Sequence, residues 1–316
     1  MKNKNLTPLF QIENGSLNSI VDLKPDYFTG FQPEHRKEIT EKEAAFYHGI
    51  TAPYSVDDKI EKKYIQVKAR DGYEIFVKTY TPKKDAEHLP CVVFIHGGGF
   101  ITCTPETHDY VPSYISANAN AKVFNVDYRL APEYKFPVGL EDCYDVLKWV
   151  EESADELGID QKNIAVAGDS SGGNFAAALT LMARDRQTVH ISKQILIYPL
   201  TDCSGSVVTS SASYYGAVGG DAMDIFEMYF KDKKKNANNI YASPMLAESH
   251  QDLPAALFIE AQCDSLRDDG LIYANILKSS GVEVNAYVYN GMPHAFILRT
   301  YSETFDALNK IVDFVK

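Results

Sequence analysis

The fold of this chain is decided by the stretch Gly168-Asp169-Ser170-Ser171-Gly172-Gly173-Asn174. A short apolar run, residues 164–167, precedes it, and an alanine-rich run, residues 175–184, follows it. This order predicts a strand, a sharp turn and a helix. A serine between glycines at such a turn sits in a tight bend that exposes its hydroxyl, as in the G-x-S-x-G nucleophile turn. The pentapeptide alone is weak evidence, so its strand-to-helix setting and the motifs elsewhere must support it.

Strand and helix patterns alternate on both sides of this turn. Apolar runs without polar alternation, such as residues 91–95, are typical of strands covered on both faces of a sheet. The other predicted elements are strands at 64–67, 73–78, 123–126, 194–198, 255–260 and 284–289 and helices at 110–120, 136–158, 270–277 and 302–315. Repeated strand–helix units predict an α/β fold, with a mostly parallel sheet flanked by helices.

Two segments fall outside this alternation. Residues 1–55 look like an accessory segment rather than part of the sheet, with one helix that begins at Pro33 and ends at Gly49. The narrow apolar stripe of that helix predicts that it lies on another surface. Between Asp202 and Leu253 the chain is rich in Ser, Gly and Tyr, with a helical piece at 225–230.

The composition argues against several classes of function. With 316 residues, 45% of them hydrophobic, the chain is long enough for one large domain with an accessory part. A formal net charge of −12 argues against nucleic acid or an anionic membrane as a partner, because both would repel it. The five cysteines lie far apart and form no C-x-x-C pair, so neither a disulfide framework nor a zinc site is expected.

No segment reads as a targeting or membrane signal. Residues 6–12 are interrupted by Pro8 and Gln11, so they lack the apolar core of a signal peptide. Nothing approaches the ~20 apolar residues that a membrane helix needs. We therefore expect a cytoplasmic enzyme that uses no metal or other cofactor. The sequence leaves open whether it forms a homodimer.

Four unusual loops each follow a predicted strand. They are residues 96–100, the Ser170 turn, residues 263–268 and residues 290–296. In a parallel sheet the strands end at the same edge, which is where ligands bind. The four loops should therefore gather at one end of the sheet, and this coincidence outweighs any single motif.

Three of these loops carry the groups that acyl transfer requires. A serine hydroxyl needs a base within ~2.6–3.2 Å to take its proton, and His294 can supply it. A buried carboxylate must hold that base in one tautomer, a role we assign to Asp264. The order Ser170, Asp264, His294 along the chain is one of the known arrangements of such a triad. The acids that compete with Asp264 are Glu260, Asp268 and Asp269, and we expect the last two to cap the following helix.

Backbone amides for the anionic intermediate come from residues 96–100, which we call the glycine loop, and from the Ser170 turn. Gly98 and Gly99 can present bare N–H groups because no side chain shields them, and the N–H of Ser171 faces the same point. We expect His96 to be structural, orienting the glycine loop. Asp169 is expected to brace the turn.

At these residues the chain resembles the hormone-sensitive-lipase-like branch of the α/β-hydrolases, often called bacterial family IV esterases. The likeness spans roughly residues 64–316. The matching stretches are His96-Gly97-Gly98-Gly99-Phe100, Asp127-Tyr128-Arg129-Leu130-Ala131-Pro132-Glu133, residues 168–174, Asp264-Ser265-Leu266-Arg267-Asp268 and Pro293-His294-Ala295-Phe296.

The resemblance implies an α/β-hydrolase fold with an eight-stranded, mostly parallel sheet and a helical cap. The catalytic domain would be residues 56–316, and the cap would combine the N-terminal segment, 1–55, with an insertion around 203–252. The implied roles are Ser170 as nucleophile, Asp264 as acid, His294 as base, and Gly98, Gly99 and Ser171 as oxyanion donors.

Two positions depart from the family pattern. Ser171 stands where alanine is usual, which keeps the backbone N–H but adds a hydroxyl with no assigned role. Ser265 stands where proline is usual, which loosens the acid loop without removing the carboxylate. Neither change threatens the chemistry.

The sequence therefore predicts a carboxylesterase that hydrolyses short- to medium-chain acyl esters through an acyl-enzyme on Ser170. Two alternatives stay open. The same triad serves an amidase, a lactonase or an acyltransferase, and the sequence does not separate these from an esterase. A non-catalytic ligand-binding protein on the same scaffold is disfavoured, because such proteins typically lack the base that His294 supplies.

Overall fold

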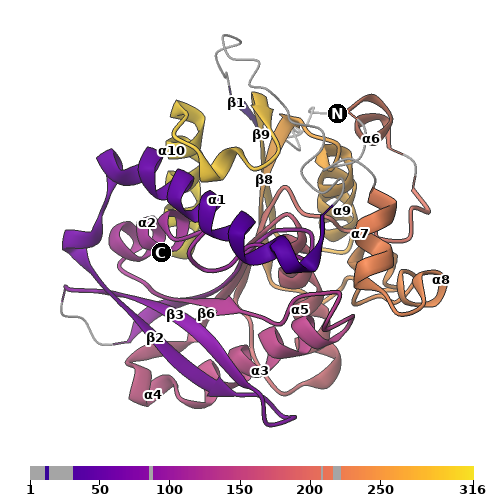
Figure 1. Cartoon of the computed structure of the whole chain (residues 1–316). Coiled ribbons are helices and arrows are strands. Elements are labelled where there is room, and N and C mark those ends of the chain that lie inside the picture. The colour runs from indigo at the N-terminus through magenta and orange to yellow at the C-terminus, as the bar shows by residue number, and fades with distance from the viewer. Residues whose placement is uncertain (1–10, 14–30, 85–87, 208, 216–221) are drawn as a thin grey trace, which may run out of the picture.

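A twisted, nine-stranded sheet forms the centre of the described chain (Figure 1). The computed structural model describes residues 11–13, 31–84, 88–207, 209–215 and 222–316. The strands are β1 Gln11–Glu13, β2 Ile60–Lys68, β3 Glu74–Pro82, β4 Leu89–Ile95, β5 Lys122–Asp127, β6 Ile159–Asp169, β7 Lys193–Ile197, β8 Ala255–Cys263 and β9 Val284–Pro293. The α-helices are α1 Arg36–Thr51, α2 Tyr110–Ala119, α3 Val138–Glu152, α4 Ala154–Leu157, α5 Ser171–Arg186, α6 Ser210–Tyr215, α7 Ala222–Tyr229, α8 Lys233–Asn236, α9 Arg267–Ser279 and α10 Ser302–Val315.

The sheet has the order β1-β9-β8-β7-β6-β4-β5-β3-β2. The pairings of β3 with β2 and with β5 are antiparallel, and every other pairing is parallel. The eight predicted strands and their mostly parallel arrangement are confirmed. The pattern follows from buried, β-branched strands connected by helices, because such crossovers cover both faces of a sheet.

One strand was not predicted. Residues 11–13 pair in parallel with β9, with Gln11 opposite Tyr287, so part of the N-terminal segment does belong to the sheet. The expectation that residues 1–55 lie wholly outside the sheet is wrong for this stretch. Three residues are too few to show the alternation that reveals a strand in a sequence.

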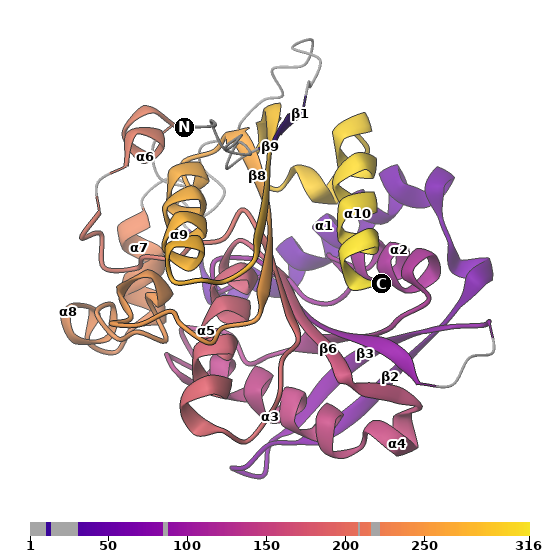
Figure 2. The same cartoon turned by 180° about the vertical axis from the view of Figure 1, so that it is seen from behind.

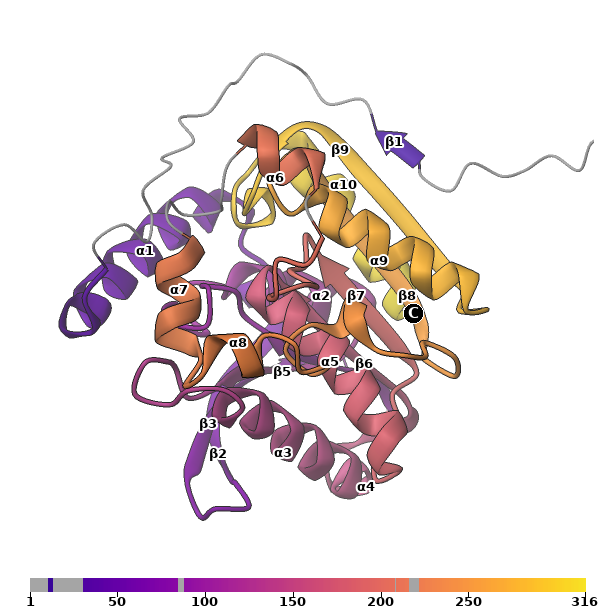
Figure 3. The same ribbon diagram turned by 90° about the vertical axis from the view of Figure 1, so that its right-hand side faces the viewer.

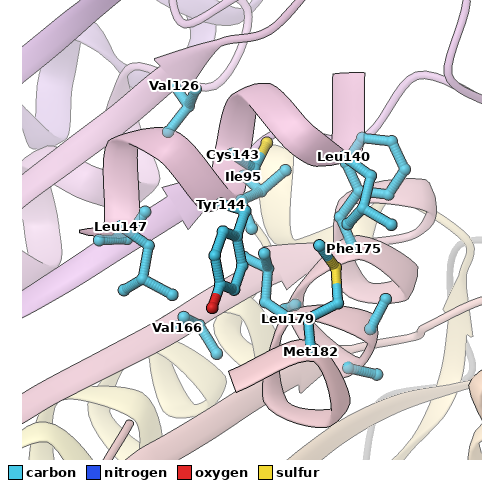
Figure 4. Packing of buried hydrophobic residues seen from close by; sticks show 14 of the residues in the cluster. Ile95, Val126, Leu140, Cys143, Tyr144, Leu147, Val166, Phe175, Leu179 and Met182 are labelled. Carbon is cyan, nitrogen blue, oxygen red and sulfur yellow. The ribbon is translucent and has the colours of Figure 1, made fainter. Parts of the chain in front are cut away.

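The sheet separates two hydrophobic cores. Helices α3, α5 and α9 cover one face, and α2 and α10 cover the other (Figure 2). Successive residues of β4 alternate between the two, with Val93 in the first core and Phe94 in the second. Figure 4 shows the first core, where Tyr144 of α3 and Leu179 of α5 pack near Val166 of β6.

The accessory helices are additional to these layers, and Ile225 and Tyr229 of the insertion join the first core. The predicted N-terminal helix is α1, preceded by the 3₁₀ turn Pro33–His35. The insertion between β7 and β8 contributes α6, α7 and α8. Although far apart in the sequence, α1 and α7 lie near each other on one side of the molecule (Figures 1 and 3). The glycine loop after β4 contacts both, as described below.

Candidate active site

Ser170 occupies the turn between β6 and α5, as predicted. Its backbone has φ 56° and ψ −119°, a left-handed conformation that is strained for a residue with a side chain. The neighbouring glycines leave no room for a larger residue. A Cβ on Gly172 would lie 2.0 Å from the carbonyl oxygen of Ile95, and one on Gly168 would lie 2.3 Å from the carbonyl oxygen of Gly172. The backbone therefore approaches closely at both positions, which only glycine allows.

The structure brings Ser170, His294 and Asp264 together at the carboxyl ends of three parallel strands. Ser170 follows β6, Asp264 follows β8 and His294 follows β9. Nε2 of His294 lies 2.9 Å from Oγ of Ser170. Nδ1 of His294 lies 2.6 Å from Oδ2 of Asp264. These contacts form one continuous hydrogen-bond chain from carboxylate to hydroxyl.

The surroundings of His294 fix its orientation. Asp264 is buried, and its other oxygen, Oδ1, accepts a hydrogen bond from the backbone N–H of Leu266 at 2.9 Å. The ring of Tyr198 lies 4.7 Å from the imidazole, centroid to centroid. Since an ionised carboxylate only accepts, Nδ1 carries the proton on this side and Nε2 is left to accept from the hydroxyl of Ser170.

The same environment changes the basicity of His294. Burial by itself lowers the pKa of this imidazole, but the charge of Asp264, its hydrogen bond and the more remote charge of Asp169 raise it further than burial lowers it. The net pKa therefore lies above the ordinary value of 6.5. An imidazole with a raised pKa is a stronger base toward the hydroxyl, provided that the pH keeps it neutral before reaction.

The glycine loop after β4 turns its backbone in a way that only glycine allows. Gly98 and Gly99 have φ of 118° and 61°. The carbonyl of Gly98 accepts from the N–H groups of Ile101 and Thr102, both at 3.1 Å. A trans peptide directs its N–H opposite to its carbonyl, so the N–H of Gly99 points away from the inside of this turn. Both glycines are partly exposed, so a bound molecule can reach them.

Ser171 is the first residue of α5, where helical N–H groups have no partner within the helix. Its hydroxyl oxygen accepts a hydrogen bond from the backbone N–H of Phe100 at 3.3 Å. No role for this hydroxyl was predicted from the sequence. In the structure it links the start of α5 to the glycine loop, so two of the expected sources of oxyanion donors are joined directly.

Asp169 has the bracing contacts that the sequence led us to expect. Its Oδ1 accepts from the N–H of Gly97 at 2.8 Å, which connects the serine turn to the glycine loop. Its carboxylate also lies 3.1 Å from Nε2 of His108. Burial raises the pKa of Asp169, but the charge and hydrogen bond of His108 and the N–H of Gly97 bring the net pKa below the usual 3.8. His108 was missed, because one histidine before a helix gives no sign of a partner 61 residues away.

His96 also has structural contacts. Its Nδ1 lies 2.7 Å from the carbonyl oxygen of Gly97, and its ring stacks on Tyr128 with centroids 4.4 Å apart. The hydroxyl of Tyr128 donates to the carbonyl of His96 at 2.9 Å. Burial lowers the pKa of His96 to about 3, so the ring is neutral at physiological pH. These contacts orient the first residue of the glycine loop.

The acids that competed with Asp264 lie elsewhere. Oδ2 of Asp269 accepts from the N–H of Thr201 at 2.6 Å, and Oδ2 of Asp268 accepts from the N–H of Ser211 at 2.9 Å. The prediction that they cap the following helix is wrong, because they lie within the first turn of α9 and bind the insertion. Glu260 is fully buried on β8, and neither of its carboxyl oxygens has a hydrogen-bond partner among the described residues.

Within the described ranges, no group of three or more His, Cys, Asp or Glu side chains is arranged to hold a metal ion. No helix in the same ranges is both long and apolar enough to cross a membrane. The five cysteines are free thiols, four of them buried. Burial raises the pKa of Cys103, which lies beside the glycine loop, well above its usual value.

Comparison with known proteins gives consistent relatives. A family profile for the alpha/beta hydrolase fold matches residues 92–298. The chain is 36% identical over 240 residues to an arylesterase of Saccharolobus solfataricus, which covers 75% of this chain and 77% of the relative. It is 38% identical over 229 residues to carboxylesterase NlhH of Mycobacterium tuberculosis, covering 71% and 72%.

Solved structures agree with the sequence relatives. The hyperthermophilic esterase from the archaeon Pyrobaculum calidifontis superimposes with a TM-score of 0.84 and 38% identity, covering 91% of this chain and 94% of that one. The thermophilic carboxylesterase EstE1, cloned from a metagenomic library, superimposes with a TM-score of 0.80 and 36% identity, covering 90% and 96%. The chain therefore belongs to the α/β-hydrolase family, in its hormone-sensitive-lipase-like or family IV branch.

Proposed function

We propose that this protein is a carboxylesterase that hydrolyses short- to medium-chain acyl esters through a Ser170–His294–Asp264 triad. The observation that carries the proposal is the continuous hydrogen-bond chain of 2.9 Å and 2.6 Å from Ser170 through His294 to Asp264. The names of the related proteins, among them an arylesterase and a carboxylesterase, support the same class of reaction.

Acylation begins when Ser170 attacks the ester carbonyl carbon. As the Oγ–C bond forms, the hydroxyl proton passes to Nε2 of His294, and Asp264 stabilises the resulting imidazolium. The carbonyl π electrons move to oxygen and give a tetrahedral oxyanion. When they return, the bond to the alcohol oxygen breaks, and His294 gives its proton to the departing alcohol. The serine is left as an acyl ester.

Deacylation repeats these steps with water as the nucleophile. Water loses a proton to Nε2 of His294 while its oxygen bonds to the acyl carbon. The second tetrahedral intermediate then expels Oγ of Ser170, which takes the proton back from His294. The carboxylic acid is released and the free enzyme is restored, so one ester and one water give one acid and one alcohol.

The oxyanion of both intermediates needs donors that are already in place. We assign this role to the backbone N–H groups of Gly98, Gly99 and Ser171. The left-handed conformation of the two glycines and the position of Ser171 at the start of α5 support the assignment. Each such donor contributes about 10²–10³ in rate, because it meets the charge without reorganisation.

The test is a series of p-nitrophenyl esters from acetate through butyrate to longer chains. Wild-type protein should turn over the shorter members, and Ser170→Ala should reduce kcat by about 10⁴ or more. A fluorophosphonate should label Ser170 covalently, which a non-catalytic ligand-binding relative would not allow. A Ser170→Ala protein as active as the wild type, or no turnover of any ester, would refute the proposal. Faster hydrolysis of matched amides or lactones, or faster acyl transfer to an added acceptor, would assign the protein to the corresponding alternative class instead.

We further propose that the N-terminal segment, 1–55, contributes α1 to a helical cap, while its residues 11–13 belong to the sheet. The insertion around 203–252 would complete this cap on the catalytic domain, residues 56–316. The positions of α1 and α7, near each other on one side of the molecule, support this division (Figures 1 and 3). We also propose a cytoplasmic location, which five free thiols suit because a reducing compartment preserves them. Whether the protein forms a homodimer stays a prediction for solution scattering to test.

A further inference from the structure

The glycine loop contacts several parts of the chain that are distant from it in sequence. Besides Asp169 and Ser171 beneath it, the loop contacts α1 from the N-terminal segment and α7 from the insertion. These last two contacts are made at Phe100 and Ile101, directly after Gly99. They are independent of each other and neither was predicted from the sequence.

Arg36 of α1 makes the first contact. Its Nε donates to the carbonyl of Ile101 at 2.7 Å, and its NH2 group donates to the carbonyl of Ala131 at 2.6 Å. The N–H of Ala131 in turn donates to the carbonyl of Phe100 at 3.0 Å. One guanidinium thus fixes the glycine loop against a second loop. It is oriented by Glu133, whose two oxygens it meets at 2.9 Å and 2.7 Å.

Tyr229 at the end of α7 makes the second contact. Its ring lies parallel to that of Phe100, at 5° and with centroids 3.9 Å apart. Both side chains are almost fully buried, at 2% and 1% exposure. Phe230, the next residue, contacts Tyr229, Phe136 and Phe226, and no contact between its ring and Phe100 is found in the described structure.

The end of α7 is itself firmly attached. Nζ of Lys135 donates to three of its terminal carbonyls, those of Glu227, Met228 and Phe230, at 2.8, 2.7 and 3.1 Å. The N–H of Phe136 donates to the carbonyl of Tyr229 at 2.9 Å. A lysine that satisfies several final carbonyls stabilises a helix end. The ring of Tyr229 therefore rests on a fixed support when it stacks on Phe100.

We infer that Arg36 and Tyr229 are positioning residues for the oxyanion donors, so the docking of α1 and α7 sets the geometry of the N–H groups on the glycine loop. The inference rests on the proposed function, because it assigns the donors to Gly98 and Gly99. Neither side chain touches the reacting atoms. Each acts through the backbone of Phe100 or Ile101. Donors must be held within roughly 0.5 Å of the productive geometry, so a small shift of this loop weakens transition-state stabilisation.

The test compares two disruptive variants with two matched controls. Arg36→Met removes both carbonyl contacts, whereas Lys42→Met removes another cation of α1, one that pairs with the exposed Glu38 of the same helix. Tyr229→Leu removes the stacked ring, whereas Phe230→Leu removes an adjacent buried ring that leaves Phe100 untouched. Tyr229→Phe keeps the stack and should restore wild-type behaviour. Thermal unfolding identifies any variant that does not fold.

Three measurements are made on each variant, with p-nitrophenyl butyrate as the substrate for the kinetics. Arg36→Met and Tyr229→Leu should each lower kcat by about tenfold or more while KM stays within about twofold. The inhibition constant of an alkyl trifluoromethyl ketone, which forms a tetrahedral oxyanion on the serine, should rise in proportion. Amide hydrogen exchange at residues 100–102 should speed up in these two variants. The controls should stay within about twofold of the wild type.

The inference is overturned if the two variants keep the wild-type kcat, or if only their KM rises. It is also overturned if their kcat falls no further than that of their controls. Unchanged amide exchange at residues 100–102 would also overturn it, and this readout does not depend on turnover. Wild type and Ser170→Ala are measured in parallel. If the wild type turns over no ester, the proposed function is refuted. If the wild type is active and the variants are unaffected, only the positioning role is refuted.

Discussion

The hydroxyl of Ser171 accepts a hydrogen bond from the backbone N–H of Phe100, 3.3 Å away and fully buried. The backbone of Ser171 is assigned to one oxyanion donor, and its side chain fixes the loop that carries the other two. A single residue thus sets the spacing among all three. Family members with alanine at this position lack this particular link.

Ser171→Ala tests that link. The backbone N–H remains, but the N–H of Phe100 loses its acceptor, which costs about 1–3 kcal/mol if nothing replaces it. If about half of that loss falls on the transition state, kcat decreases by about two- to twelvefold, since 1.4 kcal/mol is a factor of ten. Steady-state kinetics on p-nitrophenyl butyrate measure it. Ser116→Ala is the control, because it removes another buried serine hydroxyl, one that donates to the carbonyl of Tyr80.

Asp264→Asn should change both the rate and the pH profile. The neutral amide of asparagine carries no negative charge to stabilise the imidazolium of His294, and it does not accept the Nδ1 hydrogen bond as a carboxylate does. The kcat should therefore fall by about 10⁴. In the wild type, Asp264 raises the pKa of His294 above 6.5, so activity should disappear as the pH falls through that raised value. Without the charge the pKa of His294 falls, and the acid limb of kcat/KM moves to lower pH.

The control for Asp264→Asn is Asp185→Asn, which removes the same charge from an exposed position next to Arg184. Its acid limb should coincide with that of the wild type. An Asp264→Asn limb at the wild-type pH would show that the carboxylate does not control the titration of His294.

Gly172→Ala should disturb the nucleophile turn. Its Cβ would meet the carbonyl oxygen of Ile95 at 2.0 Å, and backbone atoms of β4 cannot move aside as a flexible side chain could. Overpacking of this kind costs about 1–3 kcal/mol or more and shifts the serine. We expect a lower melting temperature and slow labelling by a fluorophosphonate. Gly49→Ala, on α1 with open space around it, should have neither effect.

Glu260→Gln should stabilise the protein increasingly as the pH rises. Burial, together with the negative charge of Asp264, raises the pKa of Glu260 well above the usual 4.5, so the folded state holds the neutral acid while the unfolded state ionises. Above pH ~4.5 each pH unit therefore costs about 1.4 kcal/mol of folding free energy, until the folded-state pKa is reached. Glutamine has no such cost.

Melting temperatures of wild type and Glu260→Gln at about pH 5 and about pH 8 measure this difference. The gap in favour of Glu260→Gln should widen at the higher pH. The exposed Glu34→Gln is the control and should show no such trend. An equal gap at both pH values would mean that Glu260 finds a partner that accepts its charge.

The sequence predicted well whatever depends on local pattern combined with sheet topology. Buried runs such as residues 91–95 mark strands, and parallel strands end at one edge, so the gathering of Ser170, Asp264 and His294 at that edge followed. Motif resemblance then supplied their order and expected roles. These inferences need no knowledge of individual side-chain contacts.

Contacts between distant segments were beyond the reach of the sequence. Nothing local indicates that Arg36 reaches Ile101, or that Tyr229 stacks on Phe100. The acids after Asp264 show how a local rule misleads. Two aspartates in a first helical turn look like caps, yet Asp269 binds the backbone of Thr201, because the insertion brings that backbone within reach.

The attachment of Asp268 and Asp269 to the insertion has a consequence for protein engineering. Asp268 and Asp269 lie only a few positions after Asp264, and they bind the backbone of Ser211 and Thr201. The loop that carries the acid is therefore attached to the insertion that we propose as part of the cap. A library that diversifies the insertion to broaden substrate choice will also perturb the base, and selectivity and turnover will change together. Keeping residues 201 and 211 constant should let an engineer vary one without the other.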